Sequence, residues 1–447
     1  MLIPSLTNLL GSYTWISLLI TIIIVLQPTT ILAADYTPRE AKEFTARDGL
    51  PNFYNKLNVG EDVTIAYLGG SITAQAGWRV LSQKWIEQQY PNANIKGIEA
   101  AIGGTGSDLG VFRVENDALA YKPDLLFVEF ASNDRKASSQ SIAKSMEGIV
   151  RKTWQANPYT DICFVYTITA GDSKSLADGS MKREESMMEG VADNYGIPSV
   201  HMGYQAALLE KDDKLVMKTD ARMTRVSGDE LDEAVTLATD SAGRIIFSKD
   251  GVHPYIETGH VLYTEALIRS FKQLQNTTAE IPHELPPPLR EDNLEGARQI
   301  PLSSEYLSGD YTNMRNAGSN RFKKEMKQLY RLAPGATLSF KFKGTEVAIY
   351  DLLGYDGSEI EVTLDGETVK RTRIDSYCTY QRLSRLGIGN NLEDSLHEVS
   401  ITVLDTELDK REILFAHNRA DYDKNPQKYA PRYWYAGAIF VVGDIVE

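Results

Sequence analysis

Cysteine and histidine are both scarce in this sequence. The 447 residues include only two cysteines, Cys163 and Cys378, too few for a disulfide framework. Cys163 lies in an apolar run, as expected of a small buried hydrophobic residue, so we expect no disulfide between the pair. With only six histidines in the chain, each can be examined individually as a candidate catalytic base.

Positive charge is also under-represented. The chain has 47 Lys and Arg against 61 Asp and Glu, which gives a formal net charge of -14. A chain this acidic repels phosphate backbones, so we do not expect it to bind nucleic acid. The remaining composition, 42% hydrophobic and 24% charged, is that of a globular protein, and the length indicates two or three structural units.

Long apolar runs are absent apart from one near the N-terminus. That run extends from Trp15 to Leu26 and is followed by the small residues Ala33 and Ala34, which predicts a secretory signal peptide over residues 1–34. The usual positive N-terminal region is missing, so an uncleaved anchor or a mis-assigned start codon remain alternatives. No other stretch approaches the ~18 apolar residues of a membrane span. We therefore expect a secreted or periplasmic protein without stable membrane insertion after cleavage.

Residues 35–280 alternate short apolar runs with amphipathic segments. The runs predict buried strands and the segments predict helices, which together indicate a parallel sheet with helices on both faces. A charged stretch at 211–243 breaks this rhythm and is interpreted as an insertion, a lid or a wall of the site. The expected strands are 63–68, 95–101, 125–130, 162–168 and 197–200, and the expected helices lie near 78–90, 142–157, 181–195 and 258–274.

The C-terminal third has a different texture. Residues 281–295 are rich in proline and charge, which is typical of a linker. From residue 296 apolar and polar residues alternate in short runs, and Asp365-Gly366 has the composition of a hairpin turn. These features predict a C-terminal β-sandwich over 296–447, a jelly-roll-like accessory domain of about 150 residues.

The first candidate catalytic residue is Ser71, which follows Gly69-Gly70 at the end of a predicted strand. This placement puts a hydroxyl at the amino end of the next helix, where free N–H groups favour negative charge on a ligand. Ligands also bind at the carboxyl ends of strands in open α/β sheets. The alternative is a helix-capping serine with no chemical role.

Three further motifs follow the later strands. Gly103-Gly104 forms a glycine turn; it fails the dinucleotide-binding pattern, whose third glycine would fall at Leu109. Asn133 can donate an amide hydrogen bond, although asparagine is common in turns. Asp250 and His253 lie three apart before the last helix, where a carboxylate can orient an imidazole. His201, at the end of the fifth strand, is the competing candidate for the base.

The order of these motifs resembles the SGNH/GDSL hydrolase superfamily, in the branch with Gly-Gly-Ser-Ile-Thr. The resemblance covers roughly residues 60–275 and implies a three-layer, flavodoxin-like parallel-sheet fold. It implies Ser71 as nucleophile, His253 as base and Asp250 as its orienting acid. It also implies an oxyanion hole formed by Ser71, Gly104 and Asn133, with Gly103 as the alternative to Gly104.

The resemblance implies a serine esterase that needs no metal or organic cofactor. An exported chain, an appended β-sandwich and the lack of a long apolar lid helix favour an acylated carbohydrate, and acetyl groups in particular, as substrate. The alternatives are a lipid or aryl-ester hydrolase of the same superfamily, and a catalytically inactive glycan-binding surface protein. The sequence leaves the oligomeric state open.

Overall fold

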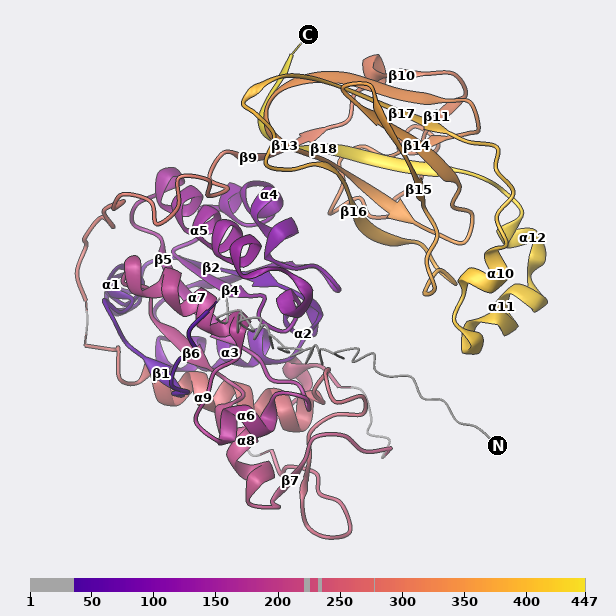
Figure 1. Cartoon of the computed structure of the whole chain (residues 1–447). Helices are drawn as coiled ribbons and strands as arrows, with labels where there is room; N and C mark the ends of the chain where they lie inside the picture. The colour runs from indigo at the N-terminus through magenta and orange to yellow at the C-terminus, as the bar shows by residue number, and fades with distance from the viewer. Residues whose placement is uncertain (1–35, 221–225, 232–234, 277, 447) are drawn as a thin grey trace, which may run out of the picture. The chain divides into compact units, whose positions relative to one another are not determined.

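The computed structural model describes residues 36–220, 226–231, 235–276 and 278–446. Residues 36–447 group as one compact unit, and the predicted signal peptide lies outside the described residues. Along the chain an α/β region, residues 36–276, is followed by a β region, residues 297–446 (Figure 1). The fold class is therefore mixed α/β with a large antiparallel β part, as the sequence predicts.

The sheet of the α/β region has six strands in the order β1-β6-β5-β4-β2-β3. Five are parallel and match the five predicted runs, and the short β1 pairs antiparallel with β6 at one edge. The strands are β1 (Phe44–Thr45), β2 (Val63–Gly69), β3 (Ile95–Ala101), β4 (Leu125–Glu129), β5 (Asp161–Tyr166) and β6 (Ser199–His201). The carboxyl ends of the parallel strands meet at one edge, where Ser71, Gly104 and Asn133 follow β2, β3 and β4.

Helices cover both faces of this sheet. Alternate residues of β2 point to opposite faces, so that Ala66 and Leu68 join one apolar cluster and Ile65 and Tyr67 join another. The first cluster includes α4, α5 and α7, and the second includes α1, α3, α8 and α9, which gives three layers. The helices are α1 (Pro51–Val59), α2 (Ser71–Ala74), α3 (Trp78–Gln89), α4 (Ser107–Asp117), α5 (Ser139–Ala156), α6 (Ser173–Ala177), α7 (Arg183–Asn194), α8 (Tyr204–Lys211) and α9 (Val261–Phe271).

One buried arginine joins the two strand ends that carry the first two motifs. Arg113 of α4 is fully buried and donates to the carbonyl oxygens of Gly69, at 3.1 Å, and Ala100. Its charge is paired with Asp117 one turn later, at 3.0 Å. A buried guanidinium is tolerated only when its charge and donors are matched, so this contact fixes the ends of β2 and β3 relative to each other.

The predicted insertion and linker differ from the alternating pattern around them. In the predicted insertion, β7 (Leu215–Val216) pairs in parallel with β8 (Ile245–Ile246), which lies just after it. Residues 221–225 and 232–234 of the insertion lie outside the described part. Residues 278–296 contain no helix or strand. The predicted last helix begins with a wider, π-helical turn at Ile256–His260, which precedes α9. Thr258, Gly259 and His260 of this turn are buried.

The β region is an antiparallel ten-stranded sheet in which the long β13 and β18 hold the other strands together. β13 pairs with β17 along its first half, with β16 along its second half, and with β18 through most of its length. Its strands are β9 (Ala297–Pro301), β10 (Leu307–Ser308), β11 (Tyr311–Asn313), β12 (Tyr330–Leu332), β13 (Thr337–Leu353), β14 (Glu359–Leu364), β15 (Glu367–Thr372), β16 (Arg382–Gly389), β17 (Ser395–Val403) and β18 (Trp434–Val446).

Two local predictions in the β region have different outcomes. The Asp365-Gly366 turn joins β14 to β15, and both residues have positive φ, 49° and 87°, as a two-residue hairpin requires. The uniform β pattern is wrong between β17 and β18. There the chain forms α10 (Lys410–Ile413), α11 (Arg419–Lys424) and α12 (Pro426–Tyr429), fastened by the buried Lys410, whose ammonium donates to the backbone oxygens of Tyr429 and Pro431.

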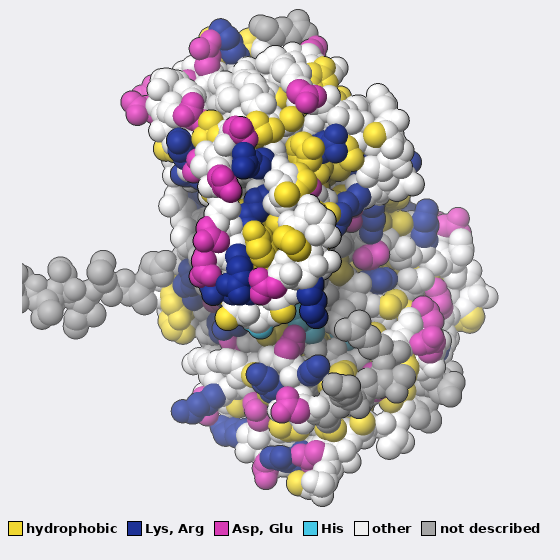
Figure 2. Space-filling view, turned by 90° about the vertical axis from the view of Figure 1, so that its right-hand side faces the viewer, with side chains coloured by type: hydrophobic (Ala, Val, Ile, Leu, Met, Phe, Trp, Pro, Cys, Tyr) yellow, Lys and Arg dark blue, Asp and Glu magenta, His cyan; other side chains and the backbone are white. Residues whose placement is uncertain are grey.

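The two regions share one apolar cluster, in which the rings of Phe112 and Phe440 stack 4.8 Å apart. Both cysteines are buried and free. None of the helices in the described ranges is long and apolar enough to span a bilayer. On the face seen in Figure 2, acidic and basic side chains are interspersed rather than gathered by sign.

Candidate active site

Ser71 is the first residue of α2, directly after the end of β2, and two glycines make this position accessible. A Cβ atom on Gly70 would lie 2.0 Å from Oδ1 of Asn133, and one on Gly69 would lie 2.9 Å from the backbone oxygen of Glu129. The Glu129 oxygen cannot move away, because it is backbone of the central strand β4. Glycine at position 70, instead of the aspartate of the GDSL pattern, therefore lets Asn133 lie against the serine turn.

A chain of two hydrogen bonds joins Ser71, His253 and Asp250. Ser71 Oγ lies 2.8 Å from His253 Nε2, and His253 Nδ1 lies 2.7 Å from Asp250 Oδ2. An ionised carboxylate only accepts, so we assign the ring proton to Nδ1, which leaves Nε2 to accept from the serine hydroxyl. The backbone N–H of His253 donates to the other Asp250 oxygen at 2.8 Å, which fixes the loop around the imidazole.

Asp250 is held in its ionised form. Partial burial raises its pKa, but hydrogen bonds from the His253 ring and from the backbone N–H groups of His253 and Val252 outweigh that effect, and the pKa lies below its usual value. A carboxylate of low pKa beside an imidazole favours the protonated ring. The arrangement can therefore store a proton on His253 while the serine oxygen reacts.

The glycine turn lies beside Ser71, and Asn133 lies beside the preceding Gly70. A Cβ atom on Gly103 would lie 3.5 Å from the Cβ of Ser71, whereas one on Gly104 would meet nothing within 4 Å. Gly104 has a φ of +77°, a left-handed conformation that glycine adopts without strain. The pair therefore lies beside Ser71 and leaves open space for a ligand oxygen, while the Asn133 amide lies on the other side of Gly70.

Glu129 is a site residue that the sequence analysis missed. Its fully buried carboxylate accepts from Thr73 Oγ1 at 2.9 Å and Thr167 Oγ1 at 2.8 Å, and from the Gly70 N–H. Burial raises its pKa, and these donors oppose the rise. Glu129 thereby holds Gly70 and Thr73, the residues on either side of Ser71 and Ile72. The available signal was an acidic residue inside the apolar run of β4, because a buried charge is costly unless it has hydrogen-bonding partners.

His260 connects the segment after α2 to the loop that carries His253. It is fully buried, its Nδ1 accepts the Trp78 N–H at 3.1 Å, and its Nε2 lies 3.2 Å from Gln75 Oε1. The Gln75 amide in turn reaches the backbone oxygen of Pro254 at 3.5 Å, next to His253. Burial lowers the pKa of His260 to about 3, so the ring stays neutral and serves as a fixed hydrogen-bonding spacer.

His201, the competing candidate for the base, has a different partner. Its buried ring lies 3.2 Å from the carboxylate of Glu185. The structure brings His253, not His201, into hydrogen bonding with Ser71. As to metals, no cluster of three or more His, Cys, Asp or Glu side chains that could hold an ion occurs among the residues described.

Asp134, directly after Asn133, supports the loop on the other side of the site. It is buried, and its Oδ1 accepts the N–H of Ser107 at 2.9 Å, at the start of the helix that follows the glycine turn. Burial raises the pKa of Asp134 to about 7. The folded chain thus holds a proton here that an unfolded chain releases near pH 4.

Because the pKa of Asp134 is raised on folding, its contribution to stability falls as pH rises from about 4 to about 7. Asp134→Asn keeps the acceptor for Ser107 but does not ionise. We expect the variant to gain free energy of unfolding relative to the parent at pH 8, and to gain much less at pH 4.5. Urea unfolding at the two pH values measures the difference. The exposed Asp394→Asn serves as control, and an equal effect of Asp134→Asn at both pH values would contradict this account.

Comparisons with known proteins give one family match and a set of solved structures of similar fold. Residues 67–229 match the model of the GDSL-like Lipase/Acylhydrolase family. No curated protein matches the sequence closely enough to be counted as a relative.

Solved structures give a likeness of fold. A two-domain esterase active on acetylated mannans, co-crystallised with mannopentaose, is 18% identical, with 88% of this chain and 94% of that chain covered and a TM-score of 0.65. A second structure, of a two-domain esterase active on acetylated mannans, has the same identity and coverage and a TM-score of 0.66. A catalytic mutant of an acetylxylan esterase from Geobacillus stearothermophilus is 16% identical over 46% of this chain and 93% of that one, at a TM-score of 0.34. Residues 67–229 therefore form a GDSL-like lipase/acylhydrolase domain, and the protein is a carboxylic ester hydrolase.

Proposed function

We propose that this protein is a secreted serine esterase that removes acyl groups, acetyl in particular, from carbohydrate. The observation that carries the proposal is the hydrogen-bonded series Ser71–His253–Asp250 at the carboxyl edge of the parallel sheet. Each side chain in it is of the type and in the order that acyl transfer through a covalent intermediate requires.

In the proposed reaction His253 Nε2 takes the proton of Ser71 as Oγ attacks the ester carbonyl. The imidazolium that forms is stabilised by the ionised Asp250 on its other nitrogen. His253 then protonates the departing alcohol oxygen, which leaves an acyl-serine. Water deprotonated by the same nitrogen attacks this ester and releases the acid, restoring Ser71.

The negative oxygen of the tetrahedral intermediate needs donors that are already in place. We assign this role to the backbone N–H groups of Ser71 and Gly104 and to the side-chain amide of Asn133. Free N–H groups at the start of a helix favour an anion. The close packing of Asn133 on Gly70, and the open space at Gly104, support this assignment.

The choice of carbohydrate rests on architecture. The two-domain esterase that is active on acetylated mannans shares the fold over nearly its whole length, β region included. That β region is large enough to serve a polymeric substrate as a second domain. The alternative substrate, a lipid or aryl ester, is favoured because the same acylhydrolase machinery can act on many esters. Secretion is a separate part of the proposal, and the apolar run at Trp15–Leu26 supports it.

Loss of the Ser71 hydroxyl tests the mechanism and the substrate together. We expect the wild-type chain to release acetate from at least one member of a panel of acetylated mannan, xylan and pectin. Ser71→Ala should lower kcat by on the order of 10⁶, because the proposed acyl intermediate forms on the Ser71 oxygen. Ser308→Ala, an exposed serine on β10, is the control. Near-normal turnover by Ser71→Ala would refute the mechanism, while hydrolysis of p-nitrophenyl acetate with none of the polysaccharides would refute the substrate.

Removal of one oxyanion donor should give a smaller and more specific loss. Asn133→Ala is expected to lower kcat by about 10²–10³, the usual effect of losing one preorganised donor, with little change in KM. Asn316→Ala, an exposed asparagine of the β region, serves as the matched control. A change confined to KM would show that Asn133 binds substrate and transition state equally, against the role proposed for it.

A further inference from the structure

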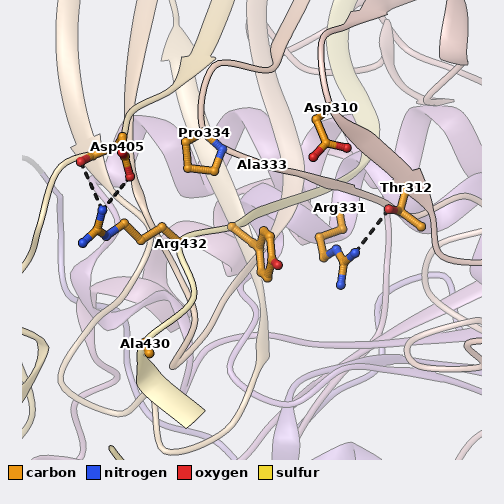
Figure 3. A pocket seen from close by; sticks show the side chains of 9 residues that line it. Asp310, Thr312, Arg331, Ala333, Pro334, Asp405, Ala430 and Arg432 are labelled. Carbon is orange, nitrogen blue, oxygen red and sulfur yellow. Dashed lines mark hydrogen bonds and ion pairs between the residues drawn. The ribbon is translucent and has the colours of Figure 1, made fainter. Parts of the chain in front are cut away.

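The β region contains a cavity of about 340 Å³ that the esterase chemistry does not use. It lies where β11, β12 and the start of β18 run side by side, and Figure 3 shows the side chains that line it. This volume is within the range of small-molecule sites. The lining combines two arginines, two aspartates and one tyrosine ring with small residues: Asp310, Thr312, Arg331, Ala333, Pro334, Asp405, Ala430, Arg432 and Tyr433.

Two of the four charged groups are already paired. The Arg432 guanidinium lies 2.5 Å from the carboxylate of Asp405. Arg331 and Asp310 line the same cavity but form no ion pair with each other or with any other described residue. Arg331 donates one hydrogen bond, to Thr312 Oγ1 at 3.2 Å, and stacks over the Tyr433 ring at 4.6 Å from its centre. Arg331 therefore keeps N–H donors beyond the one that Thr312 accepts, and the Asp310 carboxylate forms no ion pair with any described residue, on the walls of one cavity.

The backbone holds these groups in position. Asp310 lies in the turn before β11, and its carbonyl oxygen accepts the N–H of Ala333 at 3.0 Å. Arg331 lies in β12 between β11 and β18, opposite Thr312 on one side and Tyr435 on the other. Arg331, on a paired strand, loses little freedom when a ligand binds, whereas Asp310 lies in an exposed turn whose backbone is bonded to Ala333.

The pattern of charge selects the kind of ligand. An anion at Arg331 would face the carboxylate of Asp310, and a cation at Asp310 would face the guanidinium. A neutral hydroxyl group satisfies both, because it donates to Asp310 and accepts from Arg331. Tyr433 adds an aromatic ring; Arg331 lies over one face, and the C–H face of a sugar ring can pack only where the ring is not covered. Adjacent hydroxyls on a rigid ring with an apolar face are the features of a pyranose.

We propose that this cavity is a carbohydrate-binding site, in which Asp310 and Arg331 hold the hydroxyl groups of one pyranose unit and Tyr433 contacts its ring. The choice of a sugar over other neutral polyols rests on the proposed function, in which the substrate is a polysaccharide. The site is separate from Ser71, since every residue that lines it belongs to the β region. It would retain the polymer between successive deacylations.

The test uses the full-length chain with Ser71→Ala, so that ligands are not hydrolysed. Binding of mannan, xylan and pectin oligosaccharides is measured by calorimetry. We expect Asp310→Ala and Arg331→Gln, each added to Ser71→Ala, to weaken binding of the preferred glycan about tenfold or more, as for hydrogen bonds to charged groups. Asp394→Ala and Arg371→Gln, both exposed in the β region, should leave it unchanged.

Two further measurements keep this proposal distinct from the esterase assignment. In the chain that retains Ser71, the cavity variants should hydrolyse p-nitrophenyl acetate normally but show a raised KM for polymeric substrate. Equal glycan affinity of Asp310→Ala, Arg331→Gln and the parent, or no glycan binding at all, would overturn the carbohydrate site even if the esterase is confirmed. Tight binding of a free amino acid, whose amine and carboxylate match Asp310 and Arg331, would also overturn it.

Discussion

The hydrogen bond between Ser71 Oγ and His253 Nε2 joins two side chains that are 182 residues apart in sequence. Such a contact has no local cause. It exists because β2 delivers Ser71 to the carboxyl edge of a parallel sheet and because the loop before α9 returns to the same edge. The topology places every candidate group of the site at the end of a strand or at the start of a helix, where backbone donors are free.

Buried polar groups give this contact its precision. Glu129 ties Gly70 and Thr73 to the central strand, Arg113 ties the ends of β2 and β3, and His260 with Gln75 connects α2 to Pro254. Each of these groups is costly to bury alone and acceptable only when its partners are in place. The hydrogen bonds that offset the cost of burial also limit the positions that the site atoms can take. Acyl transfer requires such positional accuracy.

Much of this could be predicted from sequence because the signals are local. Apolar runs ending in Gly69-Gly70 and before Asn133, and the spacing of Asp250 and His253, give strand ends and loops directly. The supporting groups could not be predicted in the same way. Glu129 and His260 act through partners far away in sequence; an acidic residue inside an apolar run indicates that Glu129 is unusual, but the sequence does not identify the partners of either residue.

The β region shows the same limit. Alternating polarity predicts its strands, and Asp365-Gly366 predicts a turn, because both depend on neighbours in sequence. The helices between β17 and β18 were missed because polar residues outnumber apolar ones there, and buried Lys410 holds them through backbone oxygens of the segment Tyr429–Pro431. The cavity with Asp310 and Arg331 arises only when three strands are brought side by side.

The central claim is that Ser71 is the residue to which the acyl group is transferred. Its most direct test is to label the active protein with a fluorophosphonate and to locate the adduct by peptide mass spectrometry while following residual esterase activity. The account predicts one adduct, on Ser71, formed in parallel with loss of activity, because His253 accepts the Ser71 hydroxyl proton at the carboxyl edge of the parallel sheet. An adduct on another residue, or complete labelling of Ser71 with activity unchanged, would contradict it.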